Sequence, residues 1–319
     1  MDIKGARIVL IGGAGLVGSH IVDLLIQQPV SEIVVVDNLV RGSRNNLTSA
    51  LRDPRVHLIE GSMLDSQLLQ EVLRPGDGVY LLASLWLKEC VEVPRQAWNT
   101  NVMGSWNVIE ACQDRQVARI VYSSSASVYG NALEVPMTED HPFNNRTTYG
   151  ATKIACEQML RAAHQQGGLP YVGLRYMNIY GPRMDYQGAY VSVMMKVLDR
   201  LFSGQPPIIH GDGSQTFDFI YVADVARANL LAMQATCCDE FFNIGCGRGT
   251  TLNELVSKLC ELEGKPFHPH YEPLTSSFVT QRIGSIDKAR DLLGFEATTP
   301  LPEGLENLLQ WRKLAHSHC

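Results

Sequence analysis

The chain has 319 residues, of which 45% are hydrophobic and 19% are charged, and this composition excludes an intrinsically disordered protein. Its net charge is −6, from 27 Lys and Arg against 33 Asp and Glu. Proteins that bind nucleic acid through its phosphates normally carry a basic excess, so no nucleic-acid partner is expected. No stretch approaches the roughly 18 uninterrupted apolar residues of a membrane-spanning helix, so no membrane partner is expected either.

The cysteines and the N-terminus indicate the cellular compartment. None of the eight cysteines belongs to a Cys-x-x-Cys pattern, and no two histidines have zinc-finger spacing, so we expect no metal site. Near the N-terminus the short apolar run Ile8–Ile11 is followed by glycines without a small-residue cleavage site, which indicates a buried strand rather than a signal peptide. We therefore expect a cytoplasmic protein with reduced thiols.

Short β-branched segments alternate with longer amphipathic ones, and this order predicts an α/β fold with a doubly wound parallel sheet. Several segments are apolar at nearly every position, such as Ile33–Val36, as expected for strands that are buried on both faces. The predicted strands are 7–11, 32–37, 56–60, 78–83, 119–123, 171–175 and 241–244. The predicted helices among them are 16–28, 66–73, 93–113 and 149–166.

The pattern changes after about residue 176, where proline, glycine and loop sequences become denser. At about 150 residues per domain, the chain length also favours two domains. We expect the second domain to be smaller and to cap the first. The helices predicted in this half are 189–202, 222–233, 252–262, 287–292 and 302–316.

A glycine-rich segment follows the first predicted strand. The three glycines of Gly12–Gly18 have the spacing G-x-x-G-x-x-G and lead into a helix. Such a turn lets the backbone approach a pyrophosphate, and the helix N-terminus supplies free N–H groups. Asp37 ends the second strand, where a carboxylate can bind both ribose hydroxyls and repel a 2′-phosphate. The pattern favours NAD over NADP, although Arg41 and Arg44 are close enough in sequence to serve a 2′-phosphate.

A Ser–Tyr–Lys set provides candidate catalytic groups. Ser123–Ser125 ends the fifth predicted strand, and Tyr149 precedes Lys153 by four residues, which places the two on one helix face. A Lys ammonium beside a phenol stabilises the phenolate and lowers the pKa of the tyrosine. Tyr149 can then take a proton from an alcohol, with Ser125 positioning that hydroxyl. Tyr-x-x-x-Lys is common by chance, and an ordinary helix pair is the alternative.

Together these motifs resemble the extended short-chain dehydrogenase/reductase family, in its NAD-dependent nucleotide-sugar epimerase/dehydratase branch. The resemblance covers nearly the whole chain. The matching pieces occur in the order Gly12–Gly18, Asp37–Asn38, Ala83, Asn101, Ser123–Gly130, Tyr149–Lys153, Leu174–Asn178, Gly181–Arg183 and Asp218–Asp224.

The resemblance implies a Rossmann-type sheet of seven parallel strands, NAD as the cofactor and a UDP-sugar as the substrate. It implies an NAD-binding domain at 1–176, to which 217–245 returns. The sugar-nucleotide domain would then comprise 177–216 and 246–319. Homodimers that pack two helices per subunit are usual in the family, and the segments 98–112 and 149–162 would supply these helices.

The resemblance also assigns site residues. The catalytic residues would be Ser125, Tyr149 and Lys153. The cofactor would contact Gly12, Gly15, Leu16, Val17, Asp37, Asn38, Arg41, Ser62, Met63, Leu82, Ala83, Ser84, Asn101, Ser123, Tyr149, Lys153 and Tyr176. The substrate would contact Trp86, Lys88, Ser125, Ala126, Ser127, Tyr149, Asn178, Arg183, Val191, Ile208, His210 and Arg282.

The reactions of the family begin alike and then diverge. All start with Tyr-assisted hydride transfer from C4 of the sugar. Dehydratases then use an Asp–Glu pair and decarboxylases a Glu at positions where this chain has Ala126 and Ser127, neither of which is a useful general acid. Return of the hydride to the other face of the 4-keto sugar is the simplest remaining chemistry, and it gives a 4-epimerase. The alternatives are a keto-sugar reductase, a dehydratase or decarboxylase, and a noncatalytic NAD-sensing protein.

Several positions depart from the family pattern. Arg282 resembles the pyrophosphate-binding arginine, but Phe217 stands where a second arginine is usual. Ser62 replaces an acid that contacts adenine, and Ser84 replaces the last alanine of a His-Leu-Ala-Ala pattern. Arg183 can hold the diphosphate, form a surface salt bridge, or bind a C6 carboxylate. The expected substrates are therefore UDP-glucuronic and UDP-galacturonic acid, or UDP-glucose and UDP-galactose, with N-acetyl sugars as a further alternative.

Overall fold

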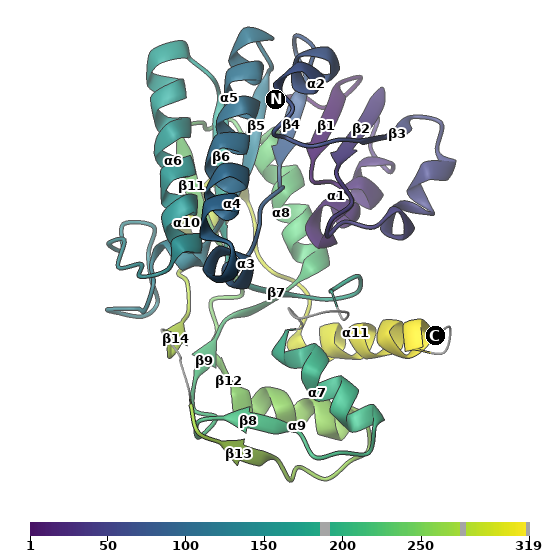
Figure 1. Ribbon diagram of the computed structural model, residues 1–319, viewed down its shortest axis with the longest axis vertical. Coiled ribbons are helices and arrows are strands. Elements are labelled where there is room, and N and C mark those ends of the chain that lie inside the picture. The colour runs from purple at the N-terminus through teal and green to yellow at the C-terminus, as the bar shows by residue number, and fades with distance from the viewer. Residues whose placement is uncertain (186–191, 275–278, 317–319) are drawn as a thin grey trace.

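The computed structural model describes residues 1–185, 192–274 and 279–316, which form a larger lobe above a smaller one (Figure 1). A seven-stranded parallel sheet is the centre of the larger lobe, in the order β11-β6-β5-β4-β1-β2-β3. The chain builds outward from β1 to β3, and then from β4 to β11 in the other direction. The switch point between β1 and β4 is where such sheets bind ligands. The strands are β1 Arg7–Ile11, β2 Glu32–Asp37, β3 Val56–Glu60, β4 Gly78–Leu81, β5 Arg119–Ser125, β6 Tyr171–Tyr176 and β11 Glu240–Ile244.

Alternate residues of each strand face opposite sides of the sheet, and both sides are covered by helices. Ile8 and Leu10 pack into one apolar cluster with α1 (Leu16–Leu25), α8 (Val222–Gln234) and α10 (Asp287–Leu293). Val9 and Ile11 pack into a second cluster on the other face. The helices of that face are α2 Ser66–Val72, α5 Gly104–Asp114 and α6 Thr148–Gly167. Burial on both faces is why strands inside the sheet, such as β1 and β2, are apolar at nearly every position. The predicted fold class is confirmed.

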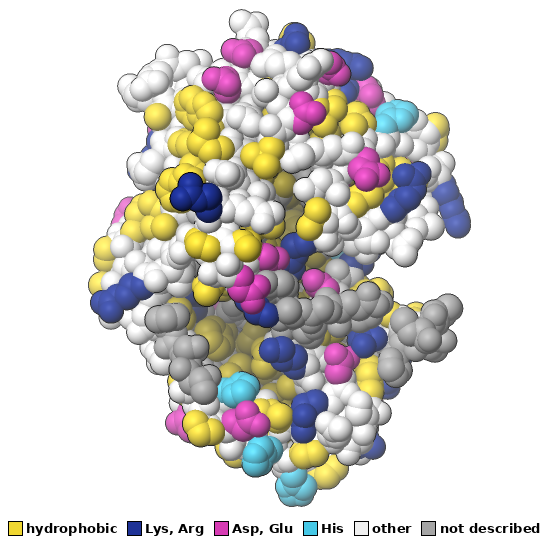
Figure 2. All heavy atoms as spheres, in the orientation of Figure 1, with side chains coloured by type: hydrophobic (Ala, Val, Ile, Leu, Met, Phe, Trp, Pro, Cys, Tyr) yellow, Lys and Arg dark blue, Asp and Glu magenta, His cyan; other side chains and the backbone are white. Residues whose placement is uncertain are grey.

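The helix predicted at 93–113 is present, and it contains a π-helical turn that was not predicted. The structure divides this segment into α4 (Pro94–Trp98), a π-helical turn η3 (Asn99–Met103) and α5, and it adds α3 (Leu87–Glu92), which was not predicted. The π turn brings Asn101 inward, where its side chain bonds the backbone of Leu85. Such turns are frequent at functional sites. On the outer side of this region, Figure 2 shows hydrophobic side chains gathered over α5 and α6.

Short strands and three helices make up the smaller lobe, around a core that includes Met195, Leu198, Leu255 and Leu305. Apolar residues three and four apart face this core from each helix. The helices are α7 Val193–Phe202, α9 Leu252–Leu262 and α11 Leu301–His316. The short strands are β7 Asn178–Tyr180, β8 Ile208–His210, β9 Thr216–Phe217, β10 Phe219–Tyr221, β12 Thr250–Thr251, β13 His270–Glu272 and β14 Gln281–Arg282. Single 3₁₀ turns occur elsewhere, at η1 Arg44–Leu47, η2 Ala50–Arg52 and η4 Ala126–Val128.

Two acids of the Asp218–Asp224 motif tie the lobes together. The Asp218 carboxylate accepts backbone N–H groups of Cys246 (2.8 Å) and Gly247 (2.9 Å). The Asp224 carboxylate accepts that of Thr298 (3.0 Å). After this motif, α8 packs against α1, and β11 pairs with β6. These positions support a return of 217–245 to the NAD-binding domain, and the boundaries at 176, 217 and 245 stay predictions.

Three further features bear on the sequence-based expectations: the cysteines, the helices long enough to span a membrane, and the start of one predicted helix. The seven cysteines in the described ranges form no disulfide. Within those same ranges, no helix has both the length and the apolar character needed to cross a membrane. The start of the predicted helix 189–202 lies outside the described residues, and the helix is seen from Val193 onward.

Candidate active site

A cavity of about 1120 Å³ lies at the carboxyl ends of the strands, next to the switch point. Single-ligand sites usually measure about 300–1,000 Å³, so this volume suits a dinucleotide together with a second ligand. Most predicted site residues meet in its wall. These are Gly12, Gly15, Leu16, Val17, Asp37, Asn38, Arg41, Ser62, Met63, Leu82, Ala83, Ser84, Trp86, Lys88, Ser123, Ser125, Ser127, Tyr149, Lys153, Tyr176, Asn178, Arg183 and Arg282.

At two positions of the glycine-rich turn, Gly12 and Gly18, no residue with a Cβ fits. Gly12 has φ +87°, and a Cβ built there would lie 2.6 Å from the backbone N of Ala83. A Cβ on Gly18 would lie 2.5 Å from the Cα of Gly13. The helix α1 begins after Gly15 with no side-chain cap and no first-turn acid among the described residues. Its N-terminal N–H groups are therefore available to an anion, and the cradle fits the pyrophosphate of NAD.

Asp37 is positioned to hold a ribose. Its side chain is 7% exposed, and its two oxygens accept the backbone N–H groups of Ala14 and Leu39, each at 2.9 Å. Burial raises the pKa of Asp37, and these two hydrogen bonds oppose the rise. A Cβ on Gly42 would lie 2.6 Å from Oδ1, so this glycine leaves the carboxylate in place. The remaining lone pairs face the cavity and suit the ribose hydroxyls of NAD.

Arg41 lies beside this ribose position but is bound elsewhere. Its guanidinium stacks on the ring of Trp86, with 3.7 Å from Cζ to the ring centroid. Nη1 lies 2.8 Å from Oε1 of Glu89, and Nη2 lies 3.4 Å from Oδ2 of Asp185. A 2′-phosphate would need the positive charge of Arg41, and Glu89 and Asp185 already neutralise that charge. This arrangement supports NAD over NADP.

Ser125, Tyr149 and Lys153 come together where β5 ends. Ser125 is the last residue of β5, and the other two lie on the first turns of α6, whose N-cap residue is Thr147. Lys153 Nζ donates to the backbone oxygen of Ser123 (2.7 Å) and lies 5.7 Å from the centroid of the Tyr149 ring. The main chain of β5 therefore holds the ammonium beside the phenol.

Burial works against the charged form of both groups. It raises the pKa of Tyr149 to about 12, although hydrogen bonding to Ser125 opposes the rise. It lowers the pKa of Lys153 to about 8. A proton can therefore leave the phenol near neutral pH only with positive charge close by. The Lys153 ammonium offers one such charge, and the oxidised nicotinamide of NAD would offer another.

Arg183 and Arg282, which line the cavity together with Arg41, differ in their partners. Arg183 Nη2 lies 2.6 Å from Oδ2 of Asp23 on α1, which favours the salt-bridge role. Arg282 has no ion pair with the described acids, and its buried Nε has no hydrogen-bond partner there. Burial lowers the pKa of Arg282 to about 10. A buried guanidinium without a carboxylate is suited to bind an anion, which supports the phosphate role of Arg282.

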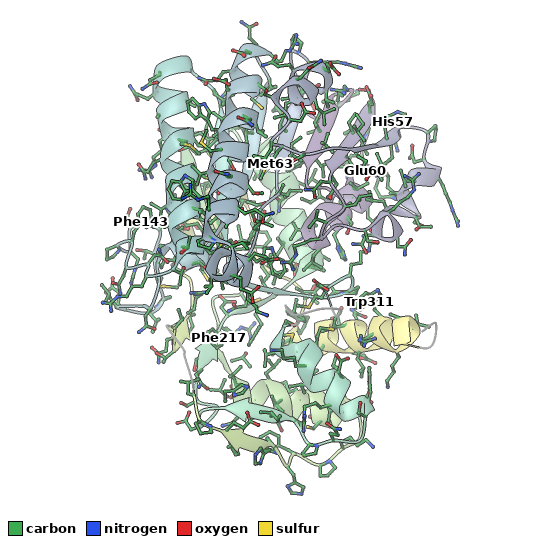
Figure 3. The ribbon with its side chains drawn as sticks, in the orientation of Figure 1. His57, Glu60, Met63, Phe143, Phe217 and Trp311 are labelled. Carbon is green, nitrogen blue, oxygen red and sulfur yellow. The ribbon has the colours of Figure 1, made fainter. Side chains whose placement is uncertain are left out.

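Phe217 stands where the family resemblance implies a second arginine. It lies on β9 (Figure 3), where its ring makes an edge contact with Phe219 at 6.2 Å between centroids. Trp311, which is also labelled there, lies on α11 and lines the cavity. The pattern of the sequence offers no motif for Trp311, because only the packing of α11 brings this residue to the site.

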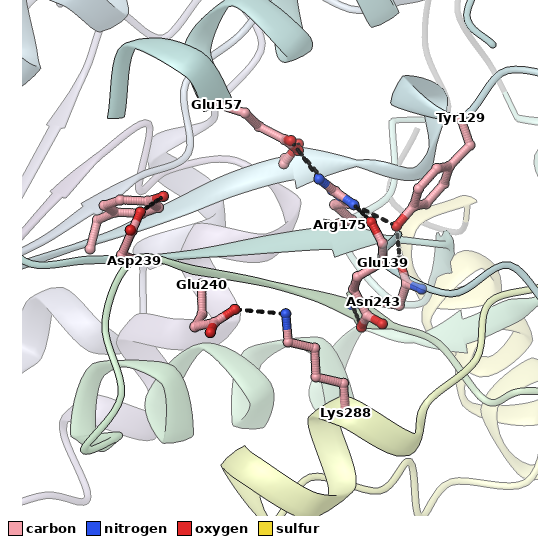
Figure 4. Close-up of polar contacts among 10 residues, drawn as sticks. Tyr129, Glu139, Glu157, Arg175, Asp239, Glu240, Asn243 and Lys288 are labelled. Atoms are coloured by element: carbon pink, nitrogen blue, oxygen red, sulfur yellow. Dashed lines mark hydrogen bonds and ion pairs between the residues drawn. The ribbon is translucent and has the colours of Figure 1, made fainter. Parts of the chain in front are cut away.

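A buried polar network fixes α6 to the sheet behind the catalytic residues (Figure 4). Glu157 on α6 is fully buried and receives Nη2 of Arg175 at 2.8 Å, and it also accepts the Ser124 hydroxyl at 2.6 Å. Arg175 Nη1 donates to the Tyr129 hydroxyl (2.8 Å), which donates to Asn243 Oδ1 (2.7 Å). The network joins α6, which carries Tyr149, to β5, which carries Ser125, and to β6 and β11.

The family model named NAD dependent epimerase/dehydratase matches residues 8–245. The chain belongs to this family. The match spans the glycine-rich turn, the Ser–Tyr–Lys set and the strand β11, so it covers the parts that the geometry brings together. The resemblance to the extended short-chain dehydrogenase/reductase family is thereby confirmed.

Solved structures agree with the family. The UDP-glucose 4-epimerase of Thermotoga maritima with UDP-glucose is 34% identical, with a TM-score of 0.91 over 97% of this chain and 99% of that one. The UDP-N-acetylglucosamine 4-epimerase of Methanobrevibacter ruminantium, in complex with UDP-N-acetylmuramic acid, is 30% identical, with a TM-score of 0.93 over 98% and 99%.

NAD is the cofactor of this family member. The UDP-glucose 4-epimerase of Thermus thermophilus, solved in complex with NAD, is 29% identical, with a TM-score of 0.86 over 96% of this chain and 99% of that one. A dTDP-glucose 4,6-dehydratase and a UDP-glucuronic acid decarboxylase are also among the relatives. The family membership alone therefore does not select the reaction.

Some predicted site residues of this epimerase/dehydratase family member lie away from the cavity wall. The Asn101 amide holds the backbone of Leu85 (2.7 and 3.0 Å) instead of facing the cofactor site. Ala126 is buried behind Ser125. Ile208 and His210 lie on β8, where His210 is exposed and its Nδ1 is 3.6 Å from Oε2 of Glu272. Val191 lies outside the described residues.

The structure also adds residues to the cavity. Gln96 and Thr100 line it from α4 and η3, and no motif in the sequence indicated them. They belong to the segment predicted as a helix, in which the π turn was not predicted.

The cofactor preference of this family member is expected to depend on Asp37. Asp37→Ala and the isosteric Asp37→Asn both remove the carboxylate, so NAD binding should weaken about 10- to 100-fold, as for a lost hydrogen bond to a charged group. NADP binding should not weaken in parallel, because its repulsion is also removed. Calorimetric titration of NAD-free protein with each dinucleotide measures both. Equal affinity of the unmutated protein for NAD and NADP would contradict this role.

Proposed function

We propose that the protein is a 4-epimerase of a UDP-sugar, acting through a 4-keto intermediate. The observation that carries the proposal is the convergence of Ser125, Tyr149 and Lys153 on one cavity, beside which the positions of the dehydratase acids are Ala126 and Ser127. Ser127 lines this cavity and offers only a hydroxyl. The site can move a proton at one alcohol, and it lacks an acid at these positions to expel water or to assist loss of carbon dioxide.

The chain's own residues supply the proton chemistry. Bound NAD would supply the hydride acceptor for C4 of the sugar and a positive charge near the phenol. Tyr149 takes the proton of the C4 hydroxyl and later returns it, and Ser125 holds that hydroxyl by a hydrogen bond. Lys153 stabilises the phenolate by its charge. Arg282 holds the diphosphate, so that the sugar end can present either face.

The cations of the cavity favour a sugar with a neutral C6 group. A C6 carboxylate needs its own cation, and Arg183 is already paired with Asp23 at 2.6 Å. Arg41 is paired with Glu89 at 2.8 Å. Lys88 lies 3.3 Å from Glu92, and Lys153 is held at the Ser123 oxygen beside Tyr149. Among the described cations of the wall, Arg282 is therefore left for the diphosphate. We therefore propose UDP-glucose and UDP-galactose, or their N-acetyl forms, ahead of the uronic acid pair.

A panel of UDP-sugars, incubated without added cofactor, tests this function. UDP-glucose or UDP-N-acetylglucosamine should be converted to the C4 epimer with unchanged mass, because the hydride returns to the same sugar. UDP-glucuronic acid should react more slowly. Chromatography resolves the epimers, and mass spectrometry reports any loss.

The outcomes separate the alternatives. A product lighter by water or by carbon dioxide would assign the protein to the dehydratases or decarboxylases. A requirement for stoichiometric reduced NAD would assign it to the reductases. Absence of turnover with every sugar, together with tight NAD binding, would favour the NAD-sensing protein. Faster conversion of the uronic acid would overturn the neutral-sugar preference.

We also propose that the protein is a homodimer that packs α5 and α6 against those of its partner. Trp98, Met103 and Trp106 are 45%, 47% and 37% exposed on the outer side of this region. Exposed large apolar groups that gather on one face are typical of protein–protein interfaces.

The cytoplasmic location stays a prediction, supported by the unpaired cysteines.

A further inference from the structure

A short segment after β7 connects the two lobes at the wall of the cavity. This segment, Gly181–Asp185, is called the strap below, and β7 lies at the junction of the lobes (Figure 1). Arg183, Met184 and Asp185 of the strap all line the cavity. Met184 is 8% exposed and packs in the core of the smaller lobe. It therefore anchors the strap to that lobe.

The residues on either side of Met184 bind the larger lobe. Arg183 has φ +70°, a left-handed conformation that persists in a non-glycine residue only where its surroundings hold it. Its Nη2 lies 2.6 Å from Oδ2 of Asp23 on α1. Asp185 Oδ2 lies 3.4 Å from Nη2 of Arg41, in the loop after β2. The strap is thus tied to the larger lobe by two ion pairs.

Arg41 is itself held in place by the larger lobe. Its guanidinium stacks on the Trp86 ring and lies 2.8 Å from Oε1 of Glu89. Glu89 in turn accepts the backbone N–H of Trp86 at 3.1 Å, as part of the capping box of α3. Arg41 therefore offers Asp185 a cation whose position is set without the strap, and the contact with Asp185 can break and form again while the larger lobe keeps its structure.

The two ion pairs lie beside the positions of the cofactor. Asp23 is on α1, the helix that begins at the pyrophosphate cradle, and Arg41 follows the ribose-binding Asp37 by four residues. The cradle, Asp37 and the strap all line one cavity. We propose that the strap closes over bound NAD, so that the cofactor enters and leaves only while both ion pairs are broken. The proposal needs NAD as the cofactor and does not depend on which reaction follows.

The ion pairs join protein to protein, and this determines how their loss should act. A contact made directly to NAD stabilises the bound state, so its removal speeds release and weakens binding. A closure that makes no contact to NAD is equally stable with and without the cofactor, so it slows entry and exit alike. Weakening the strap should therefore raise both rate constants and leave Kd nearly unchanged.

The double variant Asp23→Asn/Asp185→Asn tests the closure, because it removes one acid from each ion pair and keeps the size of both side chains. Uptake of isotope-labelled NAD by NAD-free protein, and its release from loaded protein into excess unlabelled NAD, give the two rate constants. Loss of one partly exposed pair should speed each process about 2- to 5-fold. The double variant should then speed both about 4- to 25-fold, with Kd within about 2-fold of the wild type.

Asp291→Asn is the matched control. Asp291 forms an exposed pair with Arg290 at 3.1 Å on α10, a helix that contributes no described residue to the cavity wall. The same chemical change there should leave uptake and release at the rates of the wild type. The single variants Asp23→Asn and Asp185→Asn keep the test available if the double variant does not fold, because each should give the smaller change on its own.

Two results would overturn the closure. Faster release with unchanged uptake would show that these side chains contact NAD directly. Uptake and release at the rates of the wild type, in folded variants, would show that the strap does not control access to the site. Neither measurement requires turnover of a sugar, so the closure and the proposed 4-epimerase reaction can fail separately.

Discussion

Tyr149→Phe is expected to lower the rate of epimerisation by about 100- to 10,000-fold, the usual effect of removing a positioned acid–base group. The change deletes one oxygen, the only group placed to take the proton of the C4 hydroxyl under the proposed mechanism. The ring stays in place at the start of α6, so NAD should remain bound and the fold should be retained. The rate of interconversion of the UDP-sugar, measured with the NAD content of the same sample, checks both statements.

Tyr271→Phe is the matched control. Tyr271 lies on β13 in the smaller lobe, where it is 47% exposed and donates to Asn253 Oδ1 at 3.0 Å. The same atom is removed far from the cavity wall, so the rate should be unchanged. Near-full activity of Tyr149→Phe on the true substrate would show that another group moves the proton, and the mechanism would be wrong.

Glu157→Gln is expected to lower the free energy of unfolding by about 3 to 5 kcal/mol, the cost of leaving a buried charge without its partner. Glu157 and Arg175 have side chains 1% and 2% exposed, so water cannot replace the lost carboxylate. This loss is a large part of the roughly 5–15 kcal/mol that stabilises a typical domain. Urea denaturation followed by circular dichroism measures it.

Glu240→Gln provides the comparison within the same view (Figure 4). Glu240 lies 2.7 Å from Lys288 Nζ, but the two side chains are 39% and 30% exposed. Water and salt screen such a pair, and its loss should cost no more than about 1 kcal/mol. Equal destabilisation by the two variants would contradict the view that burial, rather than pairing itself, makes the Glu157–Arg175 bond important.

The sequence by itself determined the central sheet and the cofactor loop. The strands β1, β2 and β3 have the predicted bounds. In β2, the run Ile33–Val36 is apolar at successive positions, as expected for a short strand buried on both faces. The spacing of the glycines in Gly12–Gly18 predicted a tight turn. The structure has this turn, and it leaves no room for a Cβ at Gly12. Local patterns of this kind depend on neighbours in the chain, so they can be recognised before the fold is known.

The tertiary structure alone decided which side chains meet. Asn101 was expected to contact the cofactor, but the π turn directs it to the backbone of Leu85. Arg183 had three open roles, and packing places its Nη2 beside Asp23, 160 positions away in the chain, while its Nη1 has no partner among the described residues. Hydrogen bonds and ion pairs form only between atoms a few ångströms apart. The spacing of residues in the sequence does not show which distant residues the packing brings that close.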